Sequence, residues 1–355
     1  MKFLSLAALL VFTSSVCFGK TFIYISEGKD KRIAVYSLDE TNGGLKRVGA
    51  LDCNGAPGCL WAIADRSKLY ASIRSASEFA TLAVDSETGL LTHISSAPSA
   101  GSAAYIYPDK SGHWLLAAYY GEGLATVSKI VDGVVTGAPV QTFETGKKAH
   151  CIQTSPDNRF AFVPHPVDLN KVHQFKFDAE TGKLTNNDPK KMDGAEGAGP
   201  RHIQFHPNGK WAYVVNEQAK SVTHCLYDAE KGTLSRKDTV STLPDDWAEP
   251  KGSCADIEIS ADGKFVYASN RGHDSIAMFR VDQESGALTS LGQAPTAKTP
   301  RSFNLMPGEK FLVAAGQGSG ELVVYERNAE TGLLKELQRY SCGKGPAWVV
   351  GLKLD

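Results

Sequence analysis

The chain has 355 residues, of which 42% are hydrophobic and 22% charged, and its formal net charge is −1. This is the composition of an ordinary soluble globular protein. The balanced charge argues against a nucleic-acid partner, which would require a basic face.

The N-terminus has the pattern of a secretory signal peptide. Lys2 precedes a short apolar stretch, and small residues follow as far as Gly19. The apolar stretch is too short to span a bilayer. We therefore expect residues 1–19 to be removed and residues 20–355 to be exported, into the periplasm or the medium, without further membrane contact. The alternative is that the segment forms a buried first strand.

After residue 20 the chain repeats a hairpin motif of the form Asp-x-x-x-Gly, and each copy follows a strand-like run. Seven copies occur at spacings of 46 to 54 residues, beginning at Asp39, Asp85, Asp132, Asp178, Asp228, Asp282 and Asn328. The copy at Asp132 is degraded to Asp-Gly, and the last begins with Asn in place of Asp. Short strands and turns at such a period are typical of the blades of a β-propeller.

A second motif precedes each hairpin and completes the repeat. It is a Pro-Asp-Gly-like turn followed by aromatic and β-branched residues, as at Pro207 and Asp262, with a weaker copy at Ala64-Asp65-Arg66. One blade therefore has an inner, a second, a third and an outer strand. The segment after Gly345 resembles an inner strand without a blade of its own, so we expect it to close the ring in blade 1. The sequence predicts an all-β, seven-bladed propeller of four-stranded antiparallel blades in residues 20–355, with helix content near zero.

Six cysteines remain after removal of the predicted signal. Cys53 and Cys59 are separated by a turn-rich stretch, which makes them the best candidates for a disulfide in an oxidising compartment. The alternative is that all six are buried thiols. No Cys-x-x-Cys motif occurs, and we expect neither a metal nor a cofactor.

Polar side chains collect at one predicted edge of the blades. Six residues before the turn proline, at the start of the inner strand, stand Ser102, His150, Arg201, Ala255 and Arg301. Ten residues after it, at the far end of the second strand, stand Glu217, Arg271 and Gln317. Because the two strands are antiparallel, both sets lie at the same edge, around the mouth of the central channel. His202 and His273 are adjacent to this set, whereas Trp61, Trp114, Trp211 and Trp348 are expected in the core between blades.

This set suits a small anionic, oxygen-rich ligand. Guanidinium groups recognise carboxylate or phosphate and stabilise a developing oxyanion, and a neighbouring Glu or His can act as a general base. The alternative is that these residues are solvated groups at loop ends that brace neighbouring blades. Motifs of a serine hydrolase, a zinc protease and a nucleotide-binding loop are absent from the sequence.

The segments around these positions resemble a known family. Gly199-Pro-Arg-His-Ile-Gln-Phe, Asn270-Arg-Gly-His-Asp-Ser and Ala149-His-Cys-Ile-Gln are similar to segments of the seven-bladed lactonase propellers. That family includes propeller-type 6-phosphogluconolactonase and 3-carboxy-cis,cis-muconate cyclase. The resemblance covers essentially the whole mature chain and implies a site made of His150, Arg201, Glu217 and Arg271.

The expected function is hydrolysis of a sugar-acid lactone by an exported monomer. His150, Arg201, Glu217 and Arg271 would be catalytic, with Arg301, Gln317, His202 and His273 binding the substrate, a small anionic lactone or carboxylate. Two alternatives stay open: a lactone-forming enzyme like the muconate cyclase, and a propeller that binds a ligand or protein without catalysis.

Overall fold

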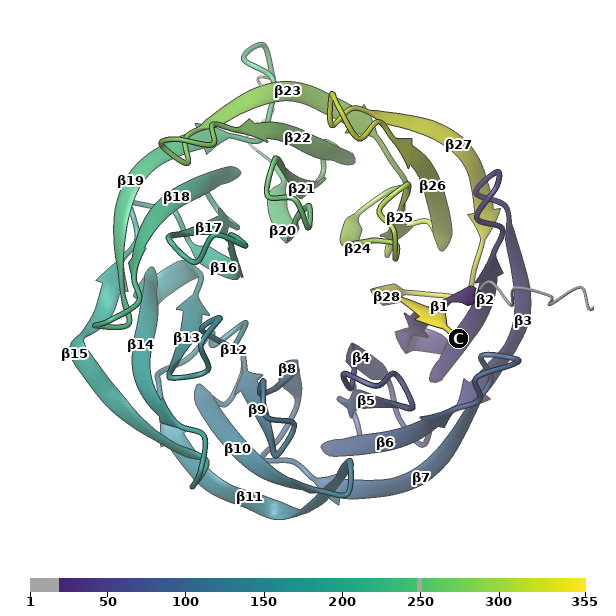
Figure 1. Ribbon diagram of the computed structural model, residues 1–355, viewed down its shortest axis with the longest axis horizontal. Coiled ribbons are helices and arrows are strands. Elements are labelled where there is room, and N and C mark those ends of the chain that lie inside the picture. Colours follow the sequence, from purple (N-terminus) through teal and green to yellow (C-terminus); the bar gives the residue numbers. More distant parts are fainter. Residues whose placement is uncertain (1–18, 248–250) are drawn as a thin grey trace, which may run out of the picture.

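Seven four-stranded antiparallel sheets are arranged in a ring around a central axis in the computed structural model, which describes residues 19–247 and 251–355 (Figure 1). The only helical segments in these ranges are two single 3₁₀ turns, η1 (Gly28–Asp30) and η2 (Val167–Leu169). The all-β, seven-bladed prediction is confirmed. Within the same ranges there is no helix with the length and apolar character needed to cross a membrane. Residues 1–18 of the predicted signal peptide lie outside the described residues.

Each blade has the four strands that the repeat predicts. From blade 1 to blade 7, the inner strands are β28 (Pro346–Leu354), β4 (Pro57–Ala62), β8 (Ala103–Pro108), β12 (Gln153–Thr154), β16 (Pro200–Phe205), β20 (Ser253–Ile259) and β24 (Pro300–Leu305). The second strands are β1 (Lys20–Glu27), β5 (Lys68–Ile73), β9 (Trp114–Tyr119), β13 (Phe160–His165), β17 (Trp211–Asn216), β21 (Phe265–Arg271) and β25 (Phe311–Gly316). The third strands are β2 (Arg32–Leu38), β6 (Glu78–Val84), β10 (Leu124–Val131), β14 (Lys171–Asp178), β18 (Ser221–Asp228), β22 (Ser275–Val281) and β26 (Glu321–Arg327). The outer strands are β3 (Leu45–Asp52), β7 (Leu91–Pro98), β11 (Val134–Glu144), β15 (Lys183–Asp193), β19 (Thr233–Ser241), β23 (Leu288–Pro295) and β27 (Leu334–Ser341).

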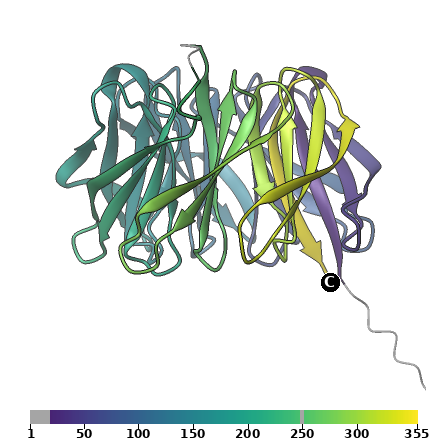
Figure 2. The same ribbon diagram turned by 90° about the horizontal axis from the view of Figure 1, so that it is seen from above.

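The C-terminal strand closes the ring, as predicted. β28 pairs with β1 from Lys20↔Leu354 to Glu27↔Pro346, so it supplies the inner strand of blade 1 and covers an edge that would otherwise be unpaired. The C-terminus therefore lies at one face of the ring (Figure 2), and the inner strands begin at the other face. We call that other face the mouth of the channel.

The repeated hairpin glycine joins one blade to the next. Gly332 has φ +76°, and a Cβ built on it would lie 2.1 Å from the ring of Phe265 in the preceding blade. Its carbonyl accepts a hydrogen bond from the hydroxyl of Tyr267, at 2.8 Å. Gly286 makes the same bond with Tyr213. The motif thus needs glycine both for its backbone conformation and for the close approach between blades.

Each inner strand has one face in the core between blades and one face in the channel. Ile203, Ile257 and Phe303 are at most 1% exposed and fill the core. The next residues along the same strands, Gln204, Glu258 and Asn304, line a cavity in the channel. This alternation determines which side chains meet around the channel axis.

The predicted disulfide is not formed: Cys53 and Cys59 are both free thiols. Cys53 follows the outer strand of blade 1, whereas Cys59 lies on the inner strand of blade 2, so the short connection between them runs from the rim to the channel. The Cys59 thiol instead donates to the carbonyl of Ile106 in blade 3, at 3.6 Å. The two cysteines are therefore close in the sequence but far apart in the structure, because the chain between them runs radially from the outer rim to the channel.

Candidate functional site

The mouth brings together residues from both sets that the repeat selects. Backbone irregularities occur where the inner strands of blades 5, 6 and 7 begin, at Pro200/His202, Cys254/Ile257 and Pro300/Ser302. The irregularity in blade 5 falls at Arg201, whose guanidinium lies against Glu217 at a second-strand end, and Arg271 lies at the next such end. We use the name mouth layer for His150, Arg201, Glu217, Arg271 and Arg301, together with Arg74.

Glu217 holds two arginines at once. Its Oε1 accepts a hydrogen bond of 2.6 Å from Nη2 of Arg271, and its Oε2 lies 3.5 Å from Nε of Arg201. Arg271 also donates to the carbonyl of Cys254, at 2.7 Å. Arg201 is only 1% exposed, and its Nη1 donates to the carbonyl of Ala255. Two guanidinium groups are thus fixed side by side, with the chemistry of an anion or oxyanion site.

Burial and positive neighbours keep His150 of the mouth layer, and His202 just below it, neutral. Burial, followed by repulsion from Arg201, His202, Arg301 and Arg271, holds the pKa of His150 well below its usual range. Burial and Arg201 likewise lower the pKa of His202 to about 4. The two rings lie 5.1 Å apart between centroids. Among the described residues, Nδ1 of His150 has no hydrogen-bond partner. A neutral imidazole with a free nitrogen is chemically able to accept a proton.

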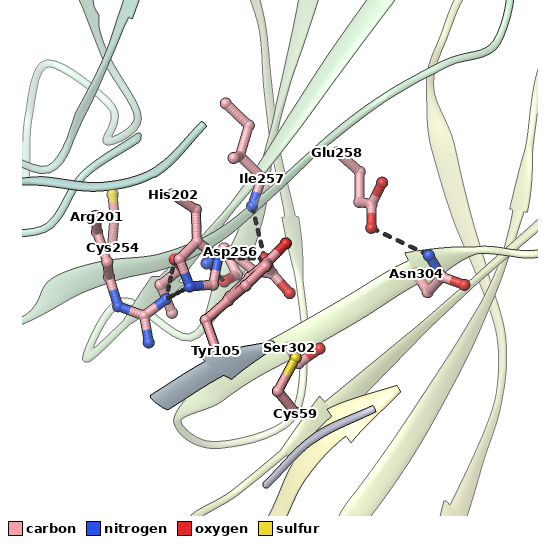
Figure 3. A network of polar contacts seen from close by, with 12 residues as sticks. Cys59, Tyr105, Arg201, His202, Cys254, Asp256, Ile257, Glu258, Ser302 and Asn304 are labelled. Carbon is pink, nitrogen blue, oxygen red and sulfur yellow. Dashed lines mark hydrogen bonds and ion pairs between the residues drawn. The ribbon is translucent and has the colours of Figure 1, made fainter. Parts of the chain in front are cut away.

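A chain of polar contacts supports Arg201 from inside the channel (Figure 3). Nη1 of Arg201 lies 3.1 Å from Nε2 of His202, and Nδ1 of His202 lies 2.8 Å from Oδ1 of Asp256. Since a guanidinium only donates, Nε2 must accept and Nδ1 must carry the proton that Asp256 accepts. Asp256 therefore fixes the tautomer of His202, and His202 in turn fixes Arg201.

Below the mouth layer, aromatic rings from three blades narrow the channel. Tyr105 of blade 3 contacts His202 of blade 5 and Trp348 of blade 1, with centroid distances of 5.2 and 5.3 Å, and His202 and Trp348 are 6.0 Å apart. We call Tyr105, His202, Asp256 and Trp348 the floor layer. Its rings separate the basic mouth from the deeper channel.

The deeper channel is acidic and aromatic. A cavity of about 290 Å³ lies there, lined by Trp61, Gln204, Glu258 and Asn304 together with three floor-layer residues, Tyr105, Asp256 and Trp348. Nδ2 of Asn304 donates to Glu258 at 3.0 Å, as Figure 3 shows. Burial, followed by the negative charge of Asp256, raises the pKa of Glu258 to about 8. Trp61 and Trp348 therefore line the channel as well as packing on the core, whereas Trp114 and Trp211 are buried between blades as expected.

Not every predicted binding residue joins the arginine cluster. Arg301 does: burial, followed by repulsion from the nearby Arg271 and Arg74, lowers its pKa to about 10. Gln317 lines a hollow of about 480 Å³ at the opposite side of the mouth. His273 contacts the hydroxyl of Ser275 at 2.6 Å and the ring of Trp247 at 4.5 Å, and neither contact connects it with the arginines.

Sequence reasoning missed three residues of this region. Arg74 follows the degraded turn at Ala64 by ten residues, as Glu217 follows Pro207. The repeat therefore could have predicted that Arg74 lies at the mouth. Asp256 stands one residue beyond Ala255, which is the residue that the repeat places at the start of the inner strand in blade 6. Glu258 faces the channel because side chains alternate between core and channel along β20. The sequence alone does not show which of the two faces meets the channel.

Other regions offer less. A wider hollow of about 700 Å³ lies along blade 1, lined by residues such as Thr21, Asp39 and Lys46, and it contains none of the predicted site residues. Across residues 19–247 and 251–355, no group of three or more His, Cys, Asp or Glu side chains is arranged to hold a metal ion.

Comparison with known proteins gives a consistent picture. The profile of the family described as "Lactonase, 7-bladed beta-propeller" matches residues 21–351. The chain is 34% identical over 336 residues to a 6-phosphogluconolactonase of Enterobacter sp. (strain 638), covering 93% of this chain and 98% of that protein. A 6-phosphogluconolactonase of Klebsiella pneumoniae (strain 342) is likewise 34% identical, over 333 residues with the same coverage.

A solved structure shares the architecture. The periplasmic gluconolactonase of Pseudomonas aeruginosa superposes with a TM-score of 0.86 at 25% identity, covering 95% of this chain and 99% of that one. The family resemblance expected from the Pro-Arg-His and Asn-Arg-Gly-His segments is confirmed.

Proposed function

The chain belongs to the seven-bladed β-propeller lactonase family, and on that premise we propose that it hydrolyses the lactone of a sugar acid at the mouth layer. The observation that carries the proposal is the pair of guanidinium groups, Arg201 and Arg271, held by one carboxylate, Glu217. The names of the relatives, 6-phosphogluconolactonase and gluconolactonase, support the substrate class.

In the proposed reaction, a water oxygen bonds to the lactone carbonyl carbon. The carbonyl oxygen gains negative charge, and Arg201 and Arg271 stabilise it. The tetrahedral intermediate then collapses, the bond from carbon to the ring oxygen breaks, and the ring oxygen takes up a proton. The product is an open-chain acid, which ionises to a carboxylate.

We assign the proton transfers to His150 rather than to Glu217. Both oxygens of Glu217 face arginines, at 2.6 and 3.5 Å, whereas the ring of His150 is neutral and its Nδ1 has no partner among the described residues. His150 would accept a proton from the attacking water and return it to the departing ring oxygen. Glu217 would keep the two guanidinium groups in place.

Residues 1–19 are proposed to direct export. Their composition supports this, and the similar gluconolactonase of P. aeruginosa is described as periplasmic. Mass spectrometry of the N-terminus of protein recovered from outside the cytoplasm tests it. We expect a mature N-terminus near residue 20, and a protein that retains Met1 and stays in the cytoplasm contradicts export.

The test of the function is a screen of lactones with the purified mature protein. We expect turnover of 6-phosphogluconolactone or gluconolactone, measured as acid release above the uncatalysed rate. Arg271→Ala should lower kcat/KM by about 10²-fold or more, because it removes a donor to the oxyanion. Arg280→Ala is the matched control, since Arg280 lies on the exposed face of the same blade, over the ring of Phe265.

Two outcomes count against the proposal. Turnover that Arg271→Ala leaves intact excludes the mouth layer as the catalytic site. Absence of turnover with every sugar lactone excludes the substrate class. A muconolactone in the same screen tests the cyclase-like alternative, because an enzyme of that kind interconverts a diacid and its lactone with the same residues. If no lactone reacts, a binding propeller is favoured.

A further inference from the structure

Blade 2 carries an arginine at the repeat position that holds Glu217 in blade 5. The backbone N–H of Arg74 donates to the carbonyl of Ala56 at 2.8 Å, as the N–H of Glu217 donates to Gly199 at 2.6 Å. Both acceptors directly precede the proline at the start of an inner strand. Arg74 is therefore a member of the same ring of second-strand ends, on the other side of the mouth.

The surroundings of Arg74 leave room for its side chain to lie inwards. A Cβ built on Gly58 would lie 2.6 Å from Cδ of Arg74, so the side chain crosses the inner strand of its own blade where glycine permits it. Nε of Arg74 then donates to Oγ of Ser102 in blade 3, at 3.2 Å. Arg74, Ser102 and Gln317 line the hollow of about 480 Å³.

The charge of this side of the mouth is unbalanced. Among the described residues, no carboxylate lies within ion-pair distance of Arg74, and the guanidinium of Arg301 has neither a hydrogen bond nor an ion pair. The exposed Glu122 acts on Arg74 only at longer range and accepts its hydrogen bond from the N–H of Ser102 instead. Glu217 is the one carboxylate of the described chain in contact with any of the four arginines of the mouth. Arg74 lines the hollow, and Arg301 is near enough for the two positive charges to act on each other. Unpaired guanidinium groups so placed are suited to bind an anion.

We propose that Arg74 and Arg301, with Ser102, form a second anion subsite that binds the phosphate group of a phosphorylated sugar lactone. This inference rests on the proposed function, because the lactone carbonyl would lie at Arg201 and Arg271 on the other side of the mouth. A phosphate at the end of the sugar remote from the carbonyl then meets two guanidinium groups and a hydroxyl. The subsite makes the enzyme selective for phosphorylated over neutral lactones.

The test compares the ratio of kcat/KM for 6-phosphogluconolactone to that for gluconolactone. We expect Arg74→Ala to lower this ratio at least about tenfold, mainly through the KM of the phosphorylated lactone, since a charge-assisted contact is removed from that substrate alone. Arg74→Lys should restore part of the ratio, because it keeps the charge but not the bidentate geometry. Arg66→Ala is the control: Arg66 is an exposed arginine of the same blade, bonded to the carbonyl of Lys353 at the opposite face, and its loss should leave the ratio unchanged.

A wild-type enzyme without preference for the phosphorylated lactone, or an unchanged ratio in Arg74→Ala, overturns the subsite while the lactonase function stands. If neither lactone reacts, the proposed function fails. Calorimetry of the binding of 6-phosphogluconate and gluconate then tests separately whether the subsite binds phosphate. In that case, binding of 6-phosphogluconate that is tighter than that of gluconate, and weakened by Arg74→Ala, supports the subsite. Equal binding of the two acids overturns it.

Discussion

The mouth and the deeper channel are built by the same blades, yet their chemistry is opposite. In blade 6, Arg271 lies at the mouth, whereas Asp256 and Glu258 face the channel below it. The mouth contains four arginines, two of which contact Glu217, and the deeper cavity contains two acids among aromatic rings. Depth along the axis, rather than the blade, therefore decides which ligand a position can contact.

Asp256 connects the two regions, and removing it should break that connection. Asp256→Leu leaves Nδ1 of His202 without its acceptor, so His202 no longer fixes Arg201. We expect kcat/KM for lactone hydrolysis to fall about tenfold or more, because small displacements of a catalytic group are costly. Asp256→Asn should retain most of the activity, since its amide oxygen still accepts from Nδ1.

A spectroscopic signature separates this positioning role from general damage. The ¹⁵N chemical shifts of His202 should report a proton on Nδ1 in the wild type and in Asp256→Asn, and a mixture of tautomers in Asp256→Leu. Wild-type activity together with unchanged histidine shifts in Asp256→Leu would show that the contact does not position Arg201.

In the deeper channel, Glu258 should affect the free energy of unfolding rather than the catalytic rate. Its pKa of about 8 in the folded state lies above the ordinary value of 4.5. Between these two values the folded protein retains a proton that the unfolded chain has lost, so the free energy of unfolding decreases as the pH rises from 4.5 to 8.

Glu258→Gln removes this charge and keeps an acceptor for Asn304. We expect it to stabilise the protein at pH 8 by about 1–3 kcal/mol, since each pKa unit corresponds to about 1.4 kcal/mol and the channel opening reduces the full effect. At pH 4.5 the difference should nearly vanish. Urea unfolding at both values measures it, and a variant equally stable to the wild type at pH 8 contradicts a proton held on Glu258.

The fold was predictable because its signals are local. The hairpin glycine recurs in all seven blades, and Gly332 shows why: only glycine fits against Phe265. The cluster of Arg201, Glu217 and Arg271 followed from antiparallel pairing alone. Its catalytic roles stay a proposal.

The remaining features could not be predicted, because they depend on how the blades are arranged around the axis. Arg74 was missed because its turn at Ala64 lacks proline and glycine. Trp61 and Trp348 were assigned to the core because a period of two does not tell which face of an inner strand meets the channel. The expected bridge between Cys53 and Cys59 was wrong because the chain crosses the full width of a sheet between them.

We propose that a neutral His150 transfers the proton while Glu217 holds Arg201 and Arg271, which form the oxyanion site. The dependence of kcat/KM on pH in the wild type, His150→Gln and Glu217→Gln tests it most directly, with His113→Gln, an exposed turn residue, as control. Since the pKa of His150 is held well below 6.5, the wild type should keep full activity as the pH falls through 6.5 and lose it only at lower pH. His150→Gln should lose about 10²-fold in activity together with this acid limb, and Glu217→Gln should lose activity but keep the limb. An unchanged rate in His150→Gln, or an acid limb that disappears only in Glu217→Gln, would contradict the account.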